Sequence, residues 1–145
     1  MPERETVERA REDAREGKSP STQAGEFVRE EMHHIREGKH GAASTKQAIA
    51  IGLSKARRAG VKLAAEGSAS TQKKAEQDSR ASQSRRKPSR TRSRATSNAL
   101  KREPRSAASR SSLSRQAKSS ALSRGKRARS VAAKKAAQTR TRRAA

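Results

Sequence analysis

The stretch that decides the fold is SPSTQAGEFVREEMHHIREG, residues 19–38. Its apolar residues recur mostly three or four positions apart, which is the spacing of one face of an α-helix. The hydroxyl groups at Ser19 to Thr22 can cap the start of a helix, and Pro20 suits its first turn. Gly38 can end it. The pattern predicts an amphipathic helix whose apolar face consists of Ala24, Phe27, Val28, Met32 and Ile35.

Two further helices are predicted, one on each side of this stretch. Residues 3–16 contain neither Gly nor Pro, and Gly17 follows them. The other helix begins at Ser44, where Ser44 and Gln47 fit a capping box, and it ends at Gly60. The apolar faces are Val7, Ala10 and Ala14 in the first helix and Ile49, Leu53 and Ala56 in the second.

A short repeat links the three predicted helices. The sequence Arg-Glu-Gly-Lys occurs at residues 15–18 and again at 36–39, and a Ser-Thr pair follows each copy. We interpret both copies as the same local structure, in which one helix ends, a glycine makes the turn and the next helix begins. Two copies are too few for a solenoid. The sequence therefore predicts a helical hairpin or three-helix domain over residues 1–63, with a small core.

Charge divides the chain into unlike parts. Residues 1–63 hold 13 basic and 10 acidic residues, whereas residues 79–145, here called the basic segment, hold 22 Lys or Arg and one acid, Glu103. The segment has no aromatic residue and few bulky apolar ones. Such a composition repels itself and lacks apolar surface to bury. We expect an all-α domain, a flexible linker over residues 64–78 and a disordered basic tail of low complexity.

Composition also excludes several classes of protein. The chain has no Cys, so disulfides, thiolate catalysis and cysteine zinc sites are absent. No apolar run approaches the roughly 18 residues that a membrane helix needs. The charged N-terminus lacks the apolar region of a signal peptide. We expect a soluble, cytoplasmic protein associated with the nucleoid, or a nuclear one if the source is eukaryotic.

The basic segment indicates a polyanionic partner. A net charge of +23 for the whole chain is typical of proteins that neutralise the phosphates of DNA or RNA. Without aromatic residues the segment cannot read bases by stacking. The candidate phosphate-binding residues are Arg85, Arg86, Lys87, Arg90, Arg92, Arg94, Lys126, Arg127, Arg129, Lys134, Lys135, Arg140, Arg142 and Arg143.

Other functional readings are weaker. Residues 44–59 carry several cations and could be the recognition helix of a helix-turn-helix, or simply a solvated basic face. Gly17-Lys18-Ser19 resembles the end of a phosphate-binding loop, but the position five residues before its glycine is Glu12. No arrangement of nucleophile and base has supporting spacing. The sequence therefore predicts a protein that is not an enzyme and has no cofactor.

The three histidines lie among glutamates. Glu30 and His33, and also Glu31 and His34, have the Glu-x-x-His spacing of di-iron helices. Such sites need ligands from several helices, and the sequence shows no second copy. We interpret these residues as a charged helix face and expect no metal site, with His40 uninvolved.

Residues 17–31, 36–41 and 44–60 resemble a family of small bacterial proteins of unknown function, and the resemblance extends over residues 1 to about 63. It implies no activity and no site residues. The basic segment is similar in composition to the tails of bacterial histone-H1-like proteins, which implies nucleoid association. An Arg/Ser-rich tail of the splicing type is the alternative in a eukaryote.

The sequence thus favours a non-enzymatic protein that binds DNA without sequence preference. One alternative is an RNA- or ribosome-associated protein that uses the same cations. Another is a stress or regulatory interaction module, in which the helical domain binds a protein or dimerises and the tail only localises it. The predicted interaction face is Phe27, Val28 and Ile35.

Overall fold

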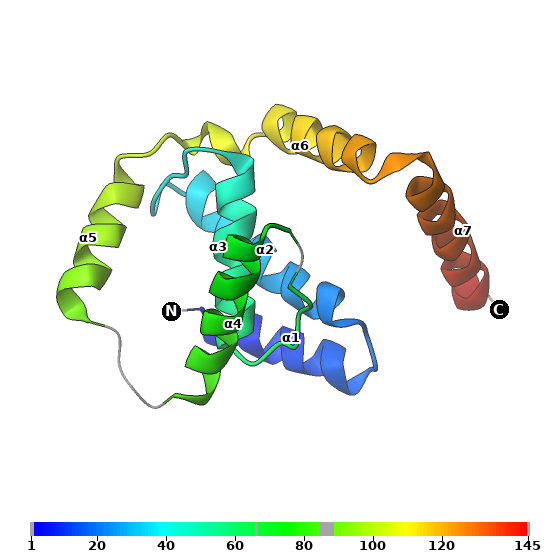
Figure 1. Cartoon of the computed structure of the whole chain (residues 1–145), viewed down its shortest axis with the longest axis horizontal. Coiled ribbons are helices and arrows are strands. Elements are labelled where there is room, and N and C mark those ends of the chain that lie inside the picture. The colour runs from blue at the N-terminus through cyan, green and yellow to red at the C-terminus, as the bar shows by residue number, and fades with distance from the viewer. Residues whose placement is uncertain (1, 66, 85–88, 145) are drawn as a thin grey trace. The chain divides into compact units, whose positions relative to one another are not determined.

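The computed structural model describes residues 2–65, 67–84 and 89–144, and the side chains up to Arg142 (Figure 1). Its described residues form seven α-helices and one short 3-10 helix, and they divide into two units between Ser109 and Arg110. The elements are α1 (Arg4–Arg15), α2 (Pro20–Arg36), α3 (Thr45–Arg58), α4 (Ala69–Gln83), α5 (Arg90–Lys101), η1 (Arg105–Ala108), α6 (Arg110–Ser123) and α7 (Gly125–Ala144).

The three predicted helices are confirmed as α1, α2 and α3. Ser19 caps α2 by accepting from the Thr22 amide, and Ser44 caps α3 by accepting from the Gln47 amide. The turn after α1 requires glycine, because Gly17 has a φ of +71°, in the left-handed region that residues with a Cβ avoid. The local signals in this part of the sequence therefore set the helix limits.

The core of the first unit lies between α1, α2 and α3. Ala10, Ala24, Phe27 and Ala56 form a buried cluster, with Val7, Leu53, Val61 and Leu63 packed around it. Helices α2 and α3 approach closely at Gly52, where a Cβ would lie 2.8 Å from the Val28 Cα. A core of small side chains thus depends on close backbone contact.

Helix α4 extends the first unit beyond residue 63. The predicted linker, residues 64–78, contains the first ten residues of this helix. α4 contacts α3 through Asp78, whose carboxylate accepts from Ser54 Oγ at 2.7 Å and from Arg58 Nε at 2.9 Å. Ala75 is buried in the same contact region. One buried acid thereby fixes a mostly polar helix.

The start of α4 repeats the start of α2. Ser68 accepts from the Thr71 amide at 3.4 Å, the same distance that separates Ser19 from the Thr22 amide. The glutamine that follows each threonine bonds backward, Gln72 Nε2 to the Gly67 carbonyl oxygen at 3.0 Å and its counterpart in α2 to Lys18 at 2.9 Å. The sequence Ser-x-Ser-Thr-Gln therefore encodes a helix start at both places.

Replacing Ser68 with Ala is expected to destabilise α4 by about 1 kcal/mol, because the Thr71 amide loses its partner. Amide hydrogen exchange along α4 should accelerate about fivefold, while exchange in α1 to α3 stays unchanged. Ser82→Ala is the control, since Ser82 lies at the other end of the helix and its hydroxyl donates to the Ser79 carbonyl instead of capping the helix start. Equal effects of the two substitutions would contradict the capping role.

The predicted disordered tail is wrong. Helices α5, α6 and α7 and the short helix η1 occupy most of residues 90–144. The prediction equated the lack of an apolar face with the lack of local structure. Ala, Arg, Lys and Gln all have high intrinsic helix propensity, and α7 has no Gly or Pro after its first residue. Propensity summed over a 20-residue segment favours the helix without any burial.

Part of the basic segment also packs against residues 1–63 of the first unit. The Gly41 amide donates to the Leu100 carbonyl at 2.8 Å, and the Ala42 amide donates to the Pro104 carbonyl at 3.1 Å. A Cβ at Gly41 would overlap the Glu103 carbonyl oxygen, so this approach needs glycine. Residues 100–108 therefore dock on the loop between α2 and α3, and we call this contact the loop clamp.

Side chains reinforce the loop clamp. Thr45 Oγ1 donates to the Ala107 carbonyl at 2.7 Å, and Arg36 Nε donates to the Ala108 carbonyl at 3.0 Å. Both alanines of η1 are buried. The first unit therefore runs to Ser109, well past the predicted boundary at residue 63.

The second unit consists of α6 and α7, which contact each other. Leu122 and Val131 are its large exposed apolar residues. No helix in the described ranges has the length and apolar character needed to cross a membrane.

Candidate functional site

Ten of the fourteen predicted phosphate-binding residues are described, and all ten are exposed on helices α5 and α7. Arg90, Arg92 and Arg94 are exposed on α5. Arg85, Arg86 and Lys87 lie outside the described residues, and the side chain of Arg143 is likewise not described. The exposed cations of α7 are Lys126, Arg127, Arg129, Lys134, Lys135, Arg140 and Arg142.

The cations of the second unit have no carboxylate nearby in the sequence. The chain from residue 110 onward contains 12 Lys or Arg, and no Asp or Glu follows Glu103. At 3.6 residues per turn, the α7 cations fall on every side of the helix. Because no single face is favoured, the helix can meet phosphates from any direction.

The predicted interaction face is used for packing inside the first unit. Phe27 and Ile35 are fully buried, and Val28 lies against Gly52 of α3. These residues are therefore taken up by contacts of the chain with itself.

Several cations of α3 are likewise engaged within the chain. Lys55 pairs with two glutamates of α2, and Arg58 pairs with Asp78 of α4 at 2.9 Å. Only some of the α3 cations are therefore available to contact a DNA groove. Lys46, near the start of α3, is exposed.

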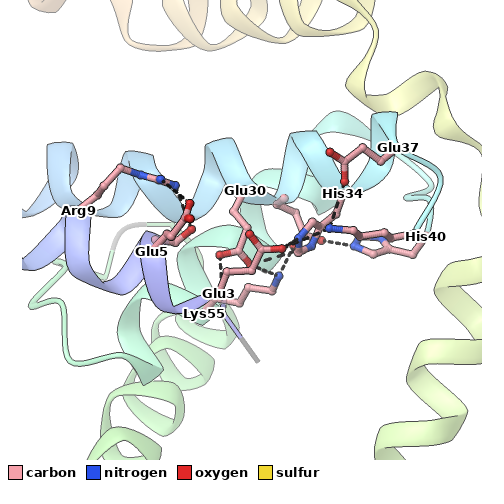
Figure 2. Close-up of polar contacts among 11 residues, drawn as sticks. Glu3, Glu5, Arg9, Glu30, His34, Glu37, His40 and Lys55 are labelled. Atoms are coloured by element: carbon pink, nitrogen blue, oxygen red, sulfur yellow. Dashed lines mark hydrogen bonds and ion pairs between the residues drawn. The ribbon is translucent and has the colours of Figure 1, made fainter.

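A second site, which the sequence did not predict, is a cluster of charged and imidazole groups between α2, α3 and the loop that joins them (Figure 2). We call it the Glu–His–Lys cluster. The side chains of Glu30 and Glu31 are only 2% and 0% exposed, so both carboxylates lie inside the protein. The members are Glu3, Glu30, Glu31, His34, His40 and Lys55.

Lys55 neutralises the two buried carboxylates. Its Nζ lies 2.7 Å from Glu31 Oε2 and 3.1 Å from Glu30 Oε1. Burial by itself would lower the pKa of Lys55, but the hydrogen bonds and charges of the glutamates outweigh burial and raise it. Burial would likewise raise the pKa of Glu30, yet hydrogen bonds from Thr6, the Glu3 amide and Lys55 lower it. Both groups therefore stay charged around neutral pH.

Each of the two histidines lies close to a different carboxylate. His34 Nε2 lies 2.8 Å from Glu3 Oε1, and His40 Nε2 lies 3.2 Å from Glu31 Oε1. Their rings are nearly perpendicular, with centroids 6.0 Å apart. His33, the neighbour of His34, is exposed and takes no part.

The interpretation of the Glu-x-x-His residues as a charged helix face is wrong for Glu30 and Glu31, because both are buried. One part of the cluster was nevertheless visible in the sequence. The Glu31-x-x-His34 spacing placed two members on one helix face. It did not find His40 or Lys55, because the turn at Gly38 brings the loop back toward α2 and the packing of α3 brings the lysine. Carboxylates and imidazoles in this arrangement can hold a cation or carry protons.

Residues 18–66 match one protein family, and this range contains every member of the cluster except Glu3. The predicted resemblance to a family of unknown function is thus confirmed, although the match begins at residue 18 and the basic segment lies outside it. No curated protein and no solved structure matches the chain. By its residues 18–66, from the turn before α2 to the stretch before α4, the chain is similar to a family of unknown function, DUF6496.

Proposed function

We propose that this chain is a non-enzymatic nucleic-acid-binding protein that holds DNA without sequence preference through the cations of α5, α6 and α7. The observation that supports the proposal best is the 12 Lys or Arg residues of the second unit without a single Asp or Glu among them. The like charges in such a segment repel one another, and binding to a polyanion relieves this repulsion. DNA and RNA are the polyanions whose charge spacing suits it.

Binding rests on phosphate neutralisation. Each Lys or Arg that meets a phosphate releases condensed counterions, which supplies free energy without reading bases. The absence of aromatic residues from residues 79–145 leaves no stacking platform. Helix α7 presents cations on all sides, so its binding to nucleic acid depends on charge density and not on one docking face.

Helices α1, α2 and α3 serve a different purpose in this proposal. Residues 1–63 carry a net charge of only +3, so they add little to phosphate binding. Their surface is available to a protein partner, which keeps an interaction module localised by the basic segment as a second candidate. The ion pairs of Lys55 and Arg58 favour this division of labour, because they remove two cations from α3.

The proposal is tested by titrating the full chain with two unrelated duplexes of equal length and one RNA hairpin at several salt concentrations. If about ten phosphates are engaged, the slope of log K against log salt on duplex DNA should be about −9. The two duplexes should bind with affinities within a few-fold of each other. A slope near zero, or a strong preference for one duplex, would contradict the proposal. Much tighter binding of the RNA would favour the RNA-associated alternative.

A further inference from the structure

When His40 is neutral, the Glu–His–Lys cluster brings two lone pairs together. His40 Nδ1 lies 3.1 Å from the Gly41 carbonyl oxygen, which can only accept, so Nδ1 carries the proton in neutral His40. The other nitrogen, Nε2, then presents a lone pair at 3.2 Å from Glu31 Oε1. Two acceptors at this distance repel, and either a proton on Nε2 or a bound cation removes the repulsion.

The Glu31 carboxylate lacks the hydrogen bonds that a buried charge needs. Its side chain is fully buried. Oε2 has the Lys55 ammonium at 2.7 Å, whereas Oε1 has no hydrogen-bond partner. An unsatisfied buried carboxylate is costly, and Lys55 compensates the charge of Oε2 only from one side. Oε1 remains directed toward the histidines.

One distance in the cluster already matches the coordination shell of a small divalent cation. Tetrahedral zinc at about 2.05 Å from its ligands separates neighbouring ligand atoms by about 3.3 Å. The His40 Nε2 to Glu31 Oε1 distance of 3.2 Å is already that of one such edge. One ligand atom each from Glu31, His34 and His40 lies within 4.8 Å of the others.

One ring nitrogen of His34 lies against a carboxylate, an arrangement that is typical of metal-binding histidines. Glu3 Oε1 lies 2.8 Å from His34 Nε2, and Lys39 Nζ holds the same oxygen at 3.2 Å. A carboxylate on one ring nitrogen fixes the ring and makes the other nitrogen a better ligand. The other nitrogen of His34, Nδ1, would be the ligand atom, and in the structure it lies 4.0 Å from Glu30 Oε1.

We propose that Glu31, His34 and His40 bind one divalent cation of the zinc class, which joins α2 to the loop that follows it. Two imidazoles and one carboxylate suit zinc and its transition-metal neighbours, whereas magnesium and calcium prefer oxygen alone. Lys55 is the competing cation: its ammonium neutralises Glu31 when no metal is bound and turns toward Glu30 when one is. The site is independent of the nucleic-acid function proposed above.

The test is a calorimetric titration of the full chain with Zn²⁺, accompanied by Co²⁺ as a probe whose visible absorption reports tetrahedral coordination. We expect one ion per chain. His40→Gln and His34→Gln should each weaken binding at least tenfold and abolish the intense cobalt bands. The matched control is His33→Gln, since His33 lies on the same helix but is exposed and outside the cluster.

A second measurement needs no substitution. The chain has three histidines, so their imidazole signals can be followed individually by NMR. Zinc should shift the signals of His34 and His40 and leave that of His33 in place. No stoichiometric uptake by the folded chain, uptake that survives His34→Gln and His40→Gln together, or shifts confined to His33 would overturn the proposal.

Discussion

Removing residues 110–145 is expected to cost far more affinity for duplex DNA at low salt than at high salt. The deletion removes 12 cations and no acid. If six of them contact phosphates, the slope of log K against log salt should become shallower by about 5. The loss of affinity should then be about a thousandfold greater at 50 mM salt than at 200 mM. Fluorescence anisotropy with a labelled duplex measures both quantities.

The choice of residue 109 as the end of the shortened chain keeps the loop clamp, so the first unit stays intact. The matched control keeps the length and helix of α7 and removes only charge, by Gln substitution of Lys126, Arg127, Arg129, Lys134, Lys135 and Arg140. This variant should make the slope shallower in proportion to the number of phosphates that these six side chains neutralise, whereas exchange of the arginines for Lys should change little. An unchanged slope in both variants would place binding in the first unit.

Lys55→Met is expected to destabilise the first unit by about 3 kcal/mol, because it leaves two buried carboxylates without their cation. Amide hydrogen exchange in α2 and α3, measured with a metal chelator present, should accelerate more than a hundredfold. Lys62→Met is the matched control, since Lys62 is exposed, and it should have almost no effect.

Adding Glu30→Gln and Glu31→Gln to Lys55→Met removes the uncompensated charges together with their partner. The triple variant should recover most of the lost stability. If it is no more stable than Lys55→Met alone, the lysine acts through packing and not through charge.

The effect of Lys55→Met should also depend on pH. The pKa of Glu30 is lowered in the folded chain, so its contribution is complete above its unfolded pKa of about 4.3 and is lost as the pH falls through the folded value. The pKa of Lys55 is raised, so its contribution is complete below about 10.4 and is lost as the pH rises through the folded value. The penalty should be largest between these limits and shrink on either side.

The sequence predicted those helices whose apolar spacing and caps agreed. For α1, α2 and α3 the glycine turns and serine caps gave the limits within a few residues. Helix α4 was missed because Gly67 and Ser68 were interpreted as a linker, although Ser68 begins the same Ser-x-Ser-Thr-Gln sequence that starts α2. The helices of the basic segment were missed because intrinsic helix propensity was not considered sufficient for a helix without burial of apolar side chains.

The candidate sites differ in how far they could be predicted. The phosphate-binding cations depend on composition, so they were visible at once. The Glu–His–Lys cluster depends on a turn and on helix packing. The spacing of Glu31 and His34 was visible, but nothing in the order of residues indicates that His40 comes back across the turn to Glu31. Contacts of this kind follow from the fold and not from any local pattern.

The loop clamp has a consequence for how the length of the chain can vary. It joins Gly41 to Leu100 and so closes a ring of 58 intervening residues, 42 to 99. The entropy lost on closing such a ring grows only with the logarithm of its length, so doubling the ring costs about 0.6 kcal/mol. Insertions or deletions in the turns between α3 and α5 should therefore disturb the clamp little. A single added methyl group at Gly41, by contrast, meets the Glu103 backbone directly. The length of the segment between the two clamp residues can therefore change at little cost, whereas residue 41 must remain glycine.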